Sequence, residues 1–207
     1  MSPNVFEFID TLISRTHVYL FSGIIRDYFI KSDKNFRDID LIVDNELDIE
    51  SFISNLEVSR NSFGGYKVII DSVAIDLWNI KNTWGIQNKS LLPFADFLPD
   101  TTFFNSSSIL YYLNGKQFII GKPFLIFLKE RKLDIVLKDN PEPALCIVNS
   151  FYYSKKYNFK FSKELSQYIV NNYTKYLDNF EIVPKKHFKR ILYTNDELLQ
   201  RIEQLLI

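Results

Sequence analysis

Residues 18–43, VYLFSGIIRDYFIKSDKNFRDIDLIV, contain two apolar segments separated by a short amphipathic one. HVYLF (17–21) has the composition of a buried strand, and Gly23 ends it. IIRDYFIK (24–31) has the apolar spacing of a short helix. DIDLIV (38–43) begins with alternating polar and apolar residues, which is typical of a strand. The stretch therefore predicts strand, helix and strand in succession.

Two aspartates begin the second of these strands. Side chains two residues apart in a strand point to the same face, so Asp38 and Asp40 project together while Ile39 faces a core. Adjacent carboxylates repel unless a cation or a proton compensates them, and oxygen ligands suit Mg²⁺ or Mn²⁺. Asp76 stands mid-strand in VAIDLW, where an acid needs a partner. Either its strand neighbours that of the pair, giving a cluster of three carboxylates, or Asp76 pairs with a buried Lys or Arg.

A turn with phosphate-binding character precedes the aspartate pair. Ser22-Gly23 follows the first strand and opens the helix, where free backbone N–H groups attract phosphate. Arg26 lies about one helical turn further on and could reach the same phosphate. The alternatives are a simple strand–helix turn and an Asp27 that ties Arg26 into the fold.

The flanking sequence extends the alternation of helices and strands. The expected elements are a helix at 4–14, a helix at 49–57 capped by Asp48, and a hairpin of strands 66–70 and 73–78 with Asp71-Ser72 as its turn. Two adjacent strands after a helix–strand alternation indicate an α+β domain with a mixed sheet and flanking helices.

The second half of the chain becomes helical. Asn105 or Ser106 is expected to cap a helix through Tyr112, and Asn114-Gly115 to turn into a strand, QFII. No strand is expected after about residue 137, and after Pro141 helices are predicted at 142–157, 162–177 and 194–206, with Ser162 and Thr194 as caps. We place a head-like domain at 1–138 and a helical, neck-like domain at 139–207.

Charge is unevenly distributed although the net charge is zero. Residues 1–100 carry nine Lys and Arg against fifteen Asp and Glu, and residues 101–207 carry sixteen against ten. An acidic half suits cation binding and a basic half suits a polyanion such as RNA. The cluster Lys185, Lys186, His187, Lys189 and Arg190 could bind an RNA backbone, or form an ordinary solvated helix surface.

Composition bounds the class of protein. With 207 residues, 46% of them hydrophobic, the chain can form a continuous core. It has no apolar run long enough for a membrane span and no signal-like N-terminus, so a cytoplasmic location without membrane contact is expected. Cys146 is the only cysteine, which excludes a disulfide within the chain and a cysteine zinc site.

The motif in residues 18–43 resembles the head domain of bacterial tRNA nucleotidyltransferases and poly(A) polymerases, within the DNA polymerase β-like superfamily. That motif is an apolar strand, Gly-Gly-x-x-Arg-Asp, a short helix, and Asp-x-Asp on the next strand. The matching residues are Gly23, Arg26, Asp27, Asp38 and Asp40.

The resemblance extends over about residues 17–180. Asp76 stands where the family has a third acid, and Lys81 stands where an Arg is frequent. Asn105 looks like the family's ribose-contacting Asn, and NPEPALCIVNSFYYSKKYNFKFSKEL looks like the neck. The resemblance implies a nucleotide site formed by Ser22, Gly23, Arg26, Lys81 and Asn105, with Mg²⁺ or Mn²⁺ bound by Asp38, Asp40 and Asp76.

Several departures from the family pattern point away from a CCA-adding enzyme. Ser22 replaces the first Gly of the pair, and the two Arg that precede the Asn are missing. The neck lacks Glu-Asp-x-x-Arg, and no Arg occurs between Arg131 and Arg190. The family's long body and tail have no counterpart in these 207 residues.

The expected activity is metal-dependent transfer of a nucleoside monophosphate from an NTP to a hydroxyl by a small, divergent nucleotidyltransferase. RNA 3′ ends, including tRNA, fit the resemblance and the basic C-terminal half. A protein hydroxyl or a small molecule fits the small size. The alternative is a catalytically inactive nucleotide- or RNA-binding protein that retains the fold. The sequence does not indicate the oligomeric state.

Overall fold

The computed structural model describes residues 2–21, 23–32, 38–61 and 63–205. The chain forms two compact units, residues 1–102 with 106–128, and residues 103–105 with 129–207. The second unit thus begins before the boundary placed at 138, because the segment after residue 129 pairs with a later part of the chain.

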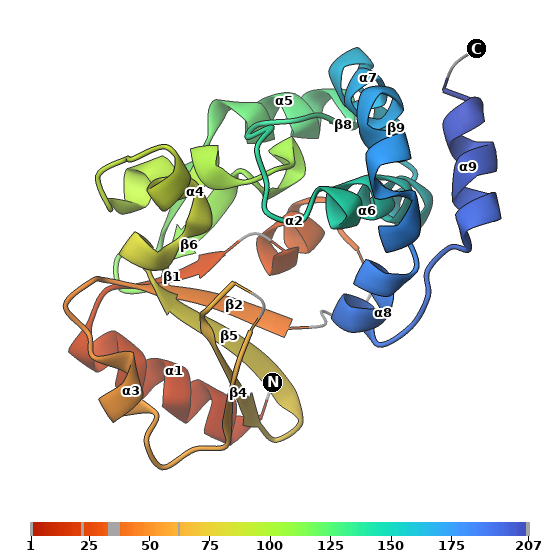
Figure 1. Cartoon of the computed structure of the whole chain (residues 1–207). Coiled ribbons are helices and arrows are strands. Elements are labelled where there is room, and N and C mark those ends of the chain that lie inside the picture. Colours follow the sequence, from red (N-terminus) through yellow and green to blue (C-terminus); the bar gives the residue numbers. More distant parts are fainter. Residues whose placement is uncertain (1, 22, 33–37, 62, 206–207) are drawn as a thin grey trace. The chain divides into compact units, whose positions relative to one another are not determined.

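The first unit contains a seven-stranded mixed sheet in the order β3-β4-β5-β2-β1-β6-β7 (Figure 1). Only β2 and β5 run parallel among these neighbours, and the remaining pairs are antiparallel. The strands are β1 (Val18–Phe21), β2 (Asp38–Val43), β3 (Val58–Arg60), β4 (Tyr66–Ile70), β5 (Val73–Asn79), β6 (Ile109–Tyr112) and β7 (Gln117–Ile120). The predicted α+β class with a mixed sheet is confirmed.

One face of the sheet is covered by helices α1 (Pro3–Arg15) and α3 (Ile49–Phe52), as Figure 1 shows. The core on this face joins Leu12 of α1 and Ile49 of α3 to Ile39 of β2. Ile39 is fully buried, as the alternation of the DIDLIV strand predicted. Asp38 and Asp40 therefore belong to the other face.

The other face carries a smaller apolar cluster. Ile42 of β2 packs there with Tyr19 of β1 and with Ile86 of α4 (Trp84–Asn88). This cluster lies toward the carboxyl end of β2, where Ile42 stands, whereas Asp38 and Asp40 stand at its beginning. The arrangement leaves the amino-terminal half of β2 for polar chemistry.

The turn of the β4–β5 hairpin is Asp71-Ser72, as predicted. Both residues have positive φ, 47° and 66°, which is the conformation of a two-residue type I′ turn. This turn pairs Ile70 with Val73 and fixes the register of the whole hairpin.

Two expectations are corrected in this unit, and one further helix is found. Asn105 to Ser107 form a short 3-10 turn. The helix expected through Tyr112 is instead strand β6 (ILYY), which pairs with β1 on one side and β7 on the other. The helix expected at 49–57 ends at Phe52, and β3 follows it. Helix α5 (Lys122–Glu130), with a proline in its first turn, had not been predicted.

The second unit is mainly helical. Its helices are α6 (Pro143–Tyr157), α7 (Lys163–Asn172), α8 (Ile182–Phe188) and α9 (Asn195–Glu203). Ser162 and Thr194 cap α7 and α9 as predicted, the latter with a complete capping box. The expectation of no strand is wrong in one place, since β8 (Lys132–Leu133) pairs in parallel with β9 (Lys160–Phe161). Across the described parts of both units, no helix has the length and apolar content that a membrane crossing requires.

The single thiol gives a probe of this unit. Cys146 of α6 is buried, and burial raises the pKa of its thiol above the usual range. We expect a thiol-specific reagent such as iodoacetamide to label folded protein at least about a hundredfold more slowly than protein unfolded in urea. Mass spectrometry of timed samples measures this. Equal rates in the two conditions would show that α6 is not packed as described.

Candidate active site

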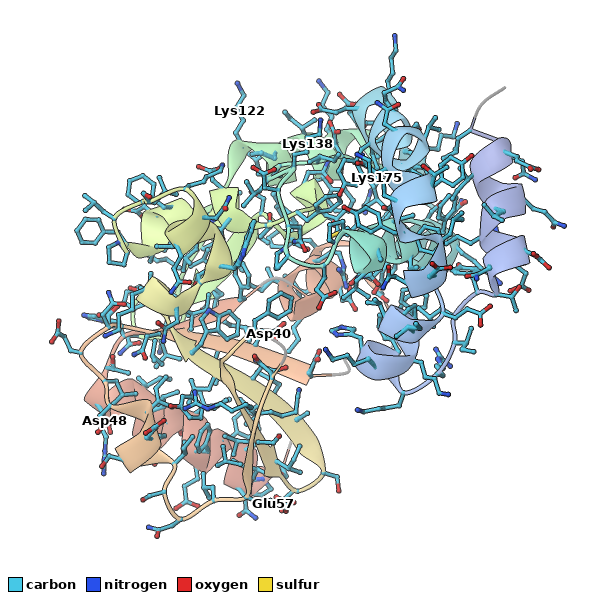
Figure 2. All side chains as sticks on the ribbon, in the orientation of Figure 1. Asp40, Asp48, Glu57, Lys122, Lys138 and Lys175 are labelled. Carbon is cyan, nitrogen blue, oxygen red and sulfur yellow. The ribbon has the colours of Figure 1, made fainter. Side chains whose placement is uncertain are left out.

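The three acids predicted to converge do so. β2 and β5 are neighbouring parallel strands, and Asp40 lies directly beside Asp76 in their register. Asp38 is two residues before Asp40 and shares its face. One carboxylate oxygen from each of the three lies within 4.8 Å of the other two. We call these residues the carboxylate cluster, and β2 places it in the middle of the sheet (Figure 2).

Such a cluster fits a hard divalent cation. Its donors are all carboxylate oxygens, which suit Mg²⁺ or Mn²⁺ better than softer metals. Asp38 and Asp40 are half-buried, and Asp76 is 8% exposed. Partial burial strengthens electrostatic attraction to a cation compared with an open surface.

Asp76 also has two protein partners. Lys67 Nζ lies 2.7 Å from Asp76 Oδ2, and Asn61 Nδ2 donates to Asp76 Oδ1 at 3.2 Å. Lys67 stands opposite Asp76 in the β4–β5 ladder. The alternative that Asp76 pairs with a lysine is therefore realised within the same cluster.

Sequence reasoning had not named Lys67, although a signal was present. A two-residue turn at Asp71-Ser72 pairs Ile70 with Val73, and counting back three positions pairs Lys67 with Asp76. Asn61 had no such signal, because its position depends on the conformation of the loop before β4.

That loop is built to hold Asn61 against Asp76. Asn61 Oδ1 accepts hydrogen bonds from the backbone N–H of Phe63 and Gly65, at 3.0 and 2.9 Å. A Cβ on Gly65 would lie 2.9 Å from Asn61 Nδ2 and 3.3 Å from the carbonyl oxygen of Leu77. The Gly64-Gly65 pair thus serves as a turn, and Gly65 permits the close approach that places the amide of Asn61.

The first residues of helix α2 (Gly23–Phe29) leave open space. Apart from the chain neighbours of Gly23 and the backbone of its own helix, no atom of the described residues lies within 4 Å of a Cβ built on Gly23, and anions are attracted to a helix N-terminus. Ser22 lies outside the described residues. Arg26 is buried and forms an ion pair with Asp27, in which Nη2 and Nε both lie close to one carboxylate oxygen, Oδ1, at 2.8 and 2.9 Å. The alternative that Asp27 ties Arg26 into the fold is therefore observed.

The two remaining nucleotide-binding candidates belong to different units. Lys81 follows the carboxyl end of β5, and its Nζ lies 3.4 Å from the carbonyl oxygen of Asn45. Asn105 belongs to the second unit and is 3% exposed. Its side chain donates to the carbonyl of Lys132 and accepts from the N–H of Asp134, both at 3.0 Å.

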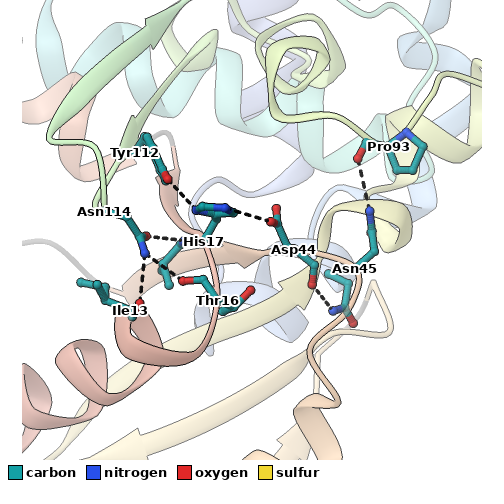
Figure 3. A network of polar contacts seen from close by, with 10 residues as sticks. Ile13, Thr16, His17, Asp44, Asn45, Pro93, Tyr112 and Asn114 are labelled. Atoms are coloured by element: carbon teal, nitrogen blue, oxygen red, sulfur yellow. Dashed lines mark hydrogen bonds and ion pairs between the residues drawn. The ribbon is translucent and has the colours of Figure 1, made fainter.

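A separate polar network closes the carboxyl end of β2 (Figure 3). His17 Nδ1 lies 2.5 Å from the Tyr112 hydroxyl, and His17 Nε2 lies 3.9 Å from Asp44 Oδ2. Burial, followed by the nearby Asp44 charge, raises the pKa of Tyr19 to about 12, so this phenol stays neutral at physiological pH.

Among the described residues, the carboxylate cluster is the one group of three or more metal-ligating side chains, and neither histidine belongs to it.

Solved structures of CCA-adding enzymes share this architecture. A CCA-adding enzyme in complex with ATP matches 99% of this chain and 52% of its own, with a TM-score of 0.69 and 14% identity. The Thermotoga maritima CCA-adding enzyme complexed with tRNA matches 99% and 52%, with a TM-score of 0.67 and 16% identity. The chain has the nucleotidyltransferase fold.

A third solved structure also shares the fold with this chain at low sequence identity. A tRNA nucleotidyltransferase complexed with a primer tRNA and an incoming ATP analog covers 82% of this chain and 51% of its own, with a TM-score of 0.60 and 14% identity. No family model matches the chain, and no curated protein matches it by sequence. The chain spans about half the length of these enzymes. The nucleotidyltransferase fold predicted from residues 18–43 is thus confirmed.

Proposed function

We propose that this protein is a metal-dependent nucleotidyltransferase that transfers NMP from an NTP to a hydroxyl acceptor. The observation that carries the proposal is the convergence of Asp38, Asp40 and Asp76 on one face of adjacent strands within a nucleotidyltransferase fold. A structural role seldom requires three acids within 4.8 Å of one another, because their mutual repulsion costs stability.

The carboxylate cluster holds the metal and orients the reactants. Asp38 and Asp40 would hold the Mg²⁺ or Mn²⁺ that accompanies the triphosphate, and Asp76 would join them in holding a second ion. The ions supply neutralisation of phosphate charge and a lowered pKa of the attacking hydroxyl. The acceptor oxygen bonds to the α-phosphorus as the bond to the β-phosphate oxygen breaks, and pyrophosphate and the hydroxyl proton leave. The protein contributes positioning and charge.

The triphosphate is assigned to Ser22, Gly23 and Arg26, whereas Lys81 and Asn105 are separate candidates for nucleotide contacts, each within its own unit. Gly23 leaves space for phosphate at the start of α2, and Arg26 three residues on would contribute positive charge by exchanging its ion pair with Asp27 for the phosphate. Asn105 contacts the ribose only if it exchanges one of its two backbone hydrogen bonds. The phosphate-binding part of this set is therefore better supported than the ribose contact.

The space at Gly23 gives a direct test of phosphate binding. Gly23→Ala adds a methyl group that, its chain neighbours and own helix backbone aside, meets no atom of the described residues within 4 Å, so we expect the free energy of unfolding to change by less than about 1 kcal/mol. The same methyl group would occupy the phosphate position, so NTP affinity should fall about tenfold or more. Calorimetric titration with ATP and Mg²⁺, beside a urea unfolding curve, measures both. Unchanged affinity would remove Gly23 from the site.

RNA is the acceptor that the observations favour. Lys185, Lys186, Lys189 and Arg190, at and after the end of α8, are exposed and basic. A basic surface of this kind attracts the phosphate backbone of RNA. Two of the structural matches are complexes with tRNA, which makes tRNA 3′ ends the first acceptor to examine.

Incubation with labelled NTPs tests the activity. The protein is mixed with each α-labelled NTP, Mg²⁺ or Mn²⁺, and cell RNA, protein or small-molecule fractions. We expect label in the RNA fraction, released by nuclease and absent with EDTA. Label in the protein or small-molecule fraction would show that the acceptor is not RNA. No label in any fraction would contradict the proposed transferase activity.

A second candidate is a non-catalytic nucleotide- or RNA-binding protein. The contacts of Asp76 favour it, because Lys67 and Asn61 already occupy one oxygen each. ATP or RNA binding that persists in EDTA, together with no labelled product, would establish this candidate.

A further inference from the structure

Asp76 forms an ion pair with a lysine, so its carboxylate already has a cationic partner without a metal ion. Its side chain is 11% exposed, and its two oxygens are 2.7 Å from Lys67 Nζ and 3.2 Å from Asn61 Nδ2. One carboxylate oxygen of Asp38 and one of Asp40 lie within 4.8 Å of an oxygen of Asp76. The ammonium group of Lys67 thus contacts one member of the carboxylate cluster, Asp76.

The pairing of β4 with β5 determines that Lys67 lies beside Asp76. Lys67 and Asp76 are paired residues on neighbouring antiparallel strands, and such side chains stand close together on one face. An ammonium at this position neutralises one of the three negative charges.

The side chain of Lys67 can also leave. It is 32% exposed, and its flexible four-carbon stem can turn toward water without disturbing β4. Asn61, by contrast, is held by two backbone N–H groups of its own loop. Of the two partners of Asp76, Lys67 is therefore the exchangeable one.

We propose that Lys67 is the resident counter-cation of the carboxylate cluster and competes with a divalent ion for Asp76. Lys67 acts as a positioning residue that sets how tightly the cluster binds metal. In the absence of nucleotide it limits the cluster to one ion, bound mainly by Asp38 and Asp40. A second ion at Asp76 requires displacement of the ammonium group.

Manganese binding tests this role without measuring activity. The full chain is titrated with Mn²⁺, and free Mn²⁺ is followed by electron paramagnetic resonance. We expect wild-type protein to bind one ion. Lys67→Met keeps the length of the side chain and removes its charge, so it should bind Mn²⁺ about tenfold or more tightly, with a second ion at higher concentration.

Lys122→Met is the matched control. Lys122 begins α5 in the same unit and points outward in Figure 2, so its removal subtracts the same charge away from the cluster. Its Mn²⁺ affinity should stay within about twofold of wild type, because exposed distant charges are screened. Equal affinity of Lys67→Met and wild type would overturn the role of Lys67.

Chemical labelling of wild-type protein tests the same exchange without a substitution. Acetic anhydride modifies exposed, unpaired amines, and mass spectrometry reports the acetylated fraction of each lysine. Excess Mn²⁺ should raise acetylation of Lys67 severalfold and leave Lys122 unchanged. Unchanged or lower acetylation of Lys67 would show that metal does not displace it.

The inference rests on the proposed metal site but fails separately from it. Absence of Mn²⁺ binding in both wild type and Lys67→Met would remove the metal site, and the role of Lys67 with it. Equal Mn²⁺ binding in both proteins would contradict only the role of Lys67. The proposed transferase activity would then still be tested by the labelled-NTP experiment.

Discussion

Asp40→Asn is expected to abolish nucleotidyl transfer while leaving the fold intact. The amide is a poorer ligand than the carboxylate for a hard cation, so transfer should fall about a thousandfold or more, equivalent to ~4 kcal/mol of transition-state stabilisation. The unfolding temperature in EDTA should equal or slightly exceed that of wild type. The reason is that one of three mutually repelling charges within 4.8 Å is removed.

Thermal melts with and without Mg²⁺ check this expectation. Wild type should gain stability on adding Mg²⁺, since a ligand that binds only the folded state stabilises it, and Asp40→Asn should gain little. Asp10→Asn is the control, because Asp10 is exposed on α1 of the same unit. A large fall in melting temperature for Asp40→Asn in EDTA, with no Mg²⁺ response in wild type, would assign Asp40 a purely structural role.

Asp76→Asn is expected to have the opposite effect on stability. This substitution leaves the Lys67 ammonium at the edge of the cluster without its carboxylate, which is 2.7 Å away in the folded protein. Loss of a partly buried ion pair by removal of one partner should lower the free energy of unfolding by about 1–3 kcal/mol. The two substitutions are thus expected to change the free energy of unfolding in opposite directions, although both aspartates belong to one cluster.

Urea denaturation in EDTA measures the difference. The double substitution Lys67→Met with Asp76→Asn removes both charges and should recover part of the stability lost in Asp76→Asn alone. If Asp76→Asn is as stable as wild type, the pair with Lys67 contributes no net stabilisation.

The position of the carboxylate cluster could be predicted because it depends on local patterns. Alternation in DIDLIV places Asp38 and Asp40 opposite Ile39, and burial of Ile39 fixes which face they occupy. The hairpin turn at Asp71-Ser72 likewise follows from turn chemistry. What remained open was whether β5 lies beside β2, and the resemblance to a known fold, not periodicity, decided that.

The segment around Asn105 could not be predicted from local patterns. SSSILYY has polar residues suited to a helix cap followed by residues that fit either a helix or a strand. Pairing of β6 between β1 and β7 decides in favour of a strand, and those partners are distant in the sequence. The same holds for Asn105, whose side chain is engaged by residues 132 and 134.

The two-residue turn of the β4–β5 hairpin controls the charge of a site that lies several residues away from it. Because the turn sets the register, it determines that a lysine, and neither of its neighbours Tyr66 and Val68, faces Asp76. Side chains alternate along a strand, so an insertion or deletion of one residue in the turn would bring an aromatic or aliphatic side chain opposite the acid. The length of this turn is therefore under a constraint that its exposed position would not suggest. Among relatives of this chain, variation in hairpin length is where differences in metal requirement should be sought.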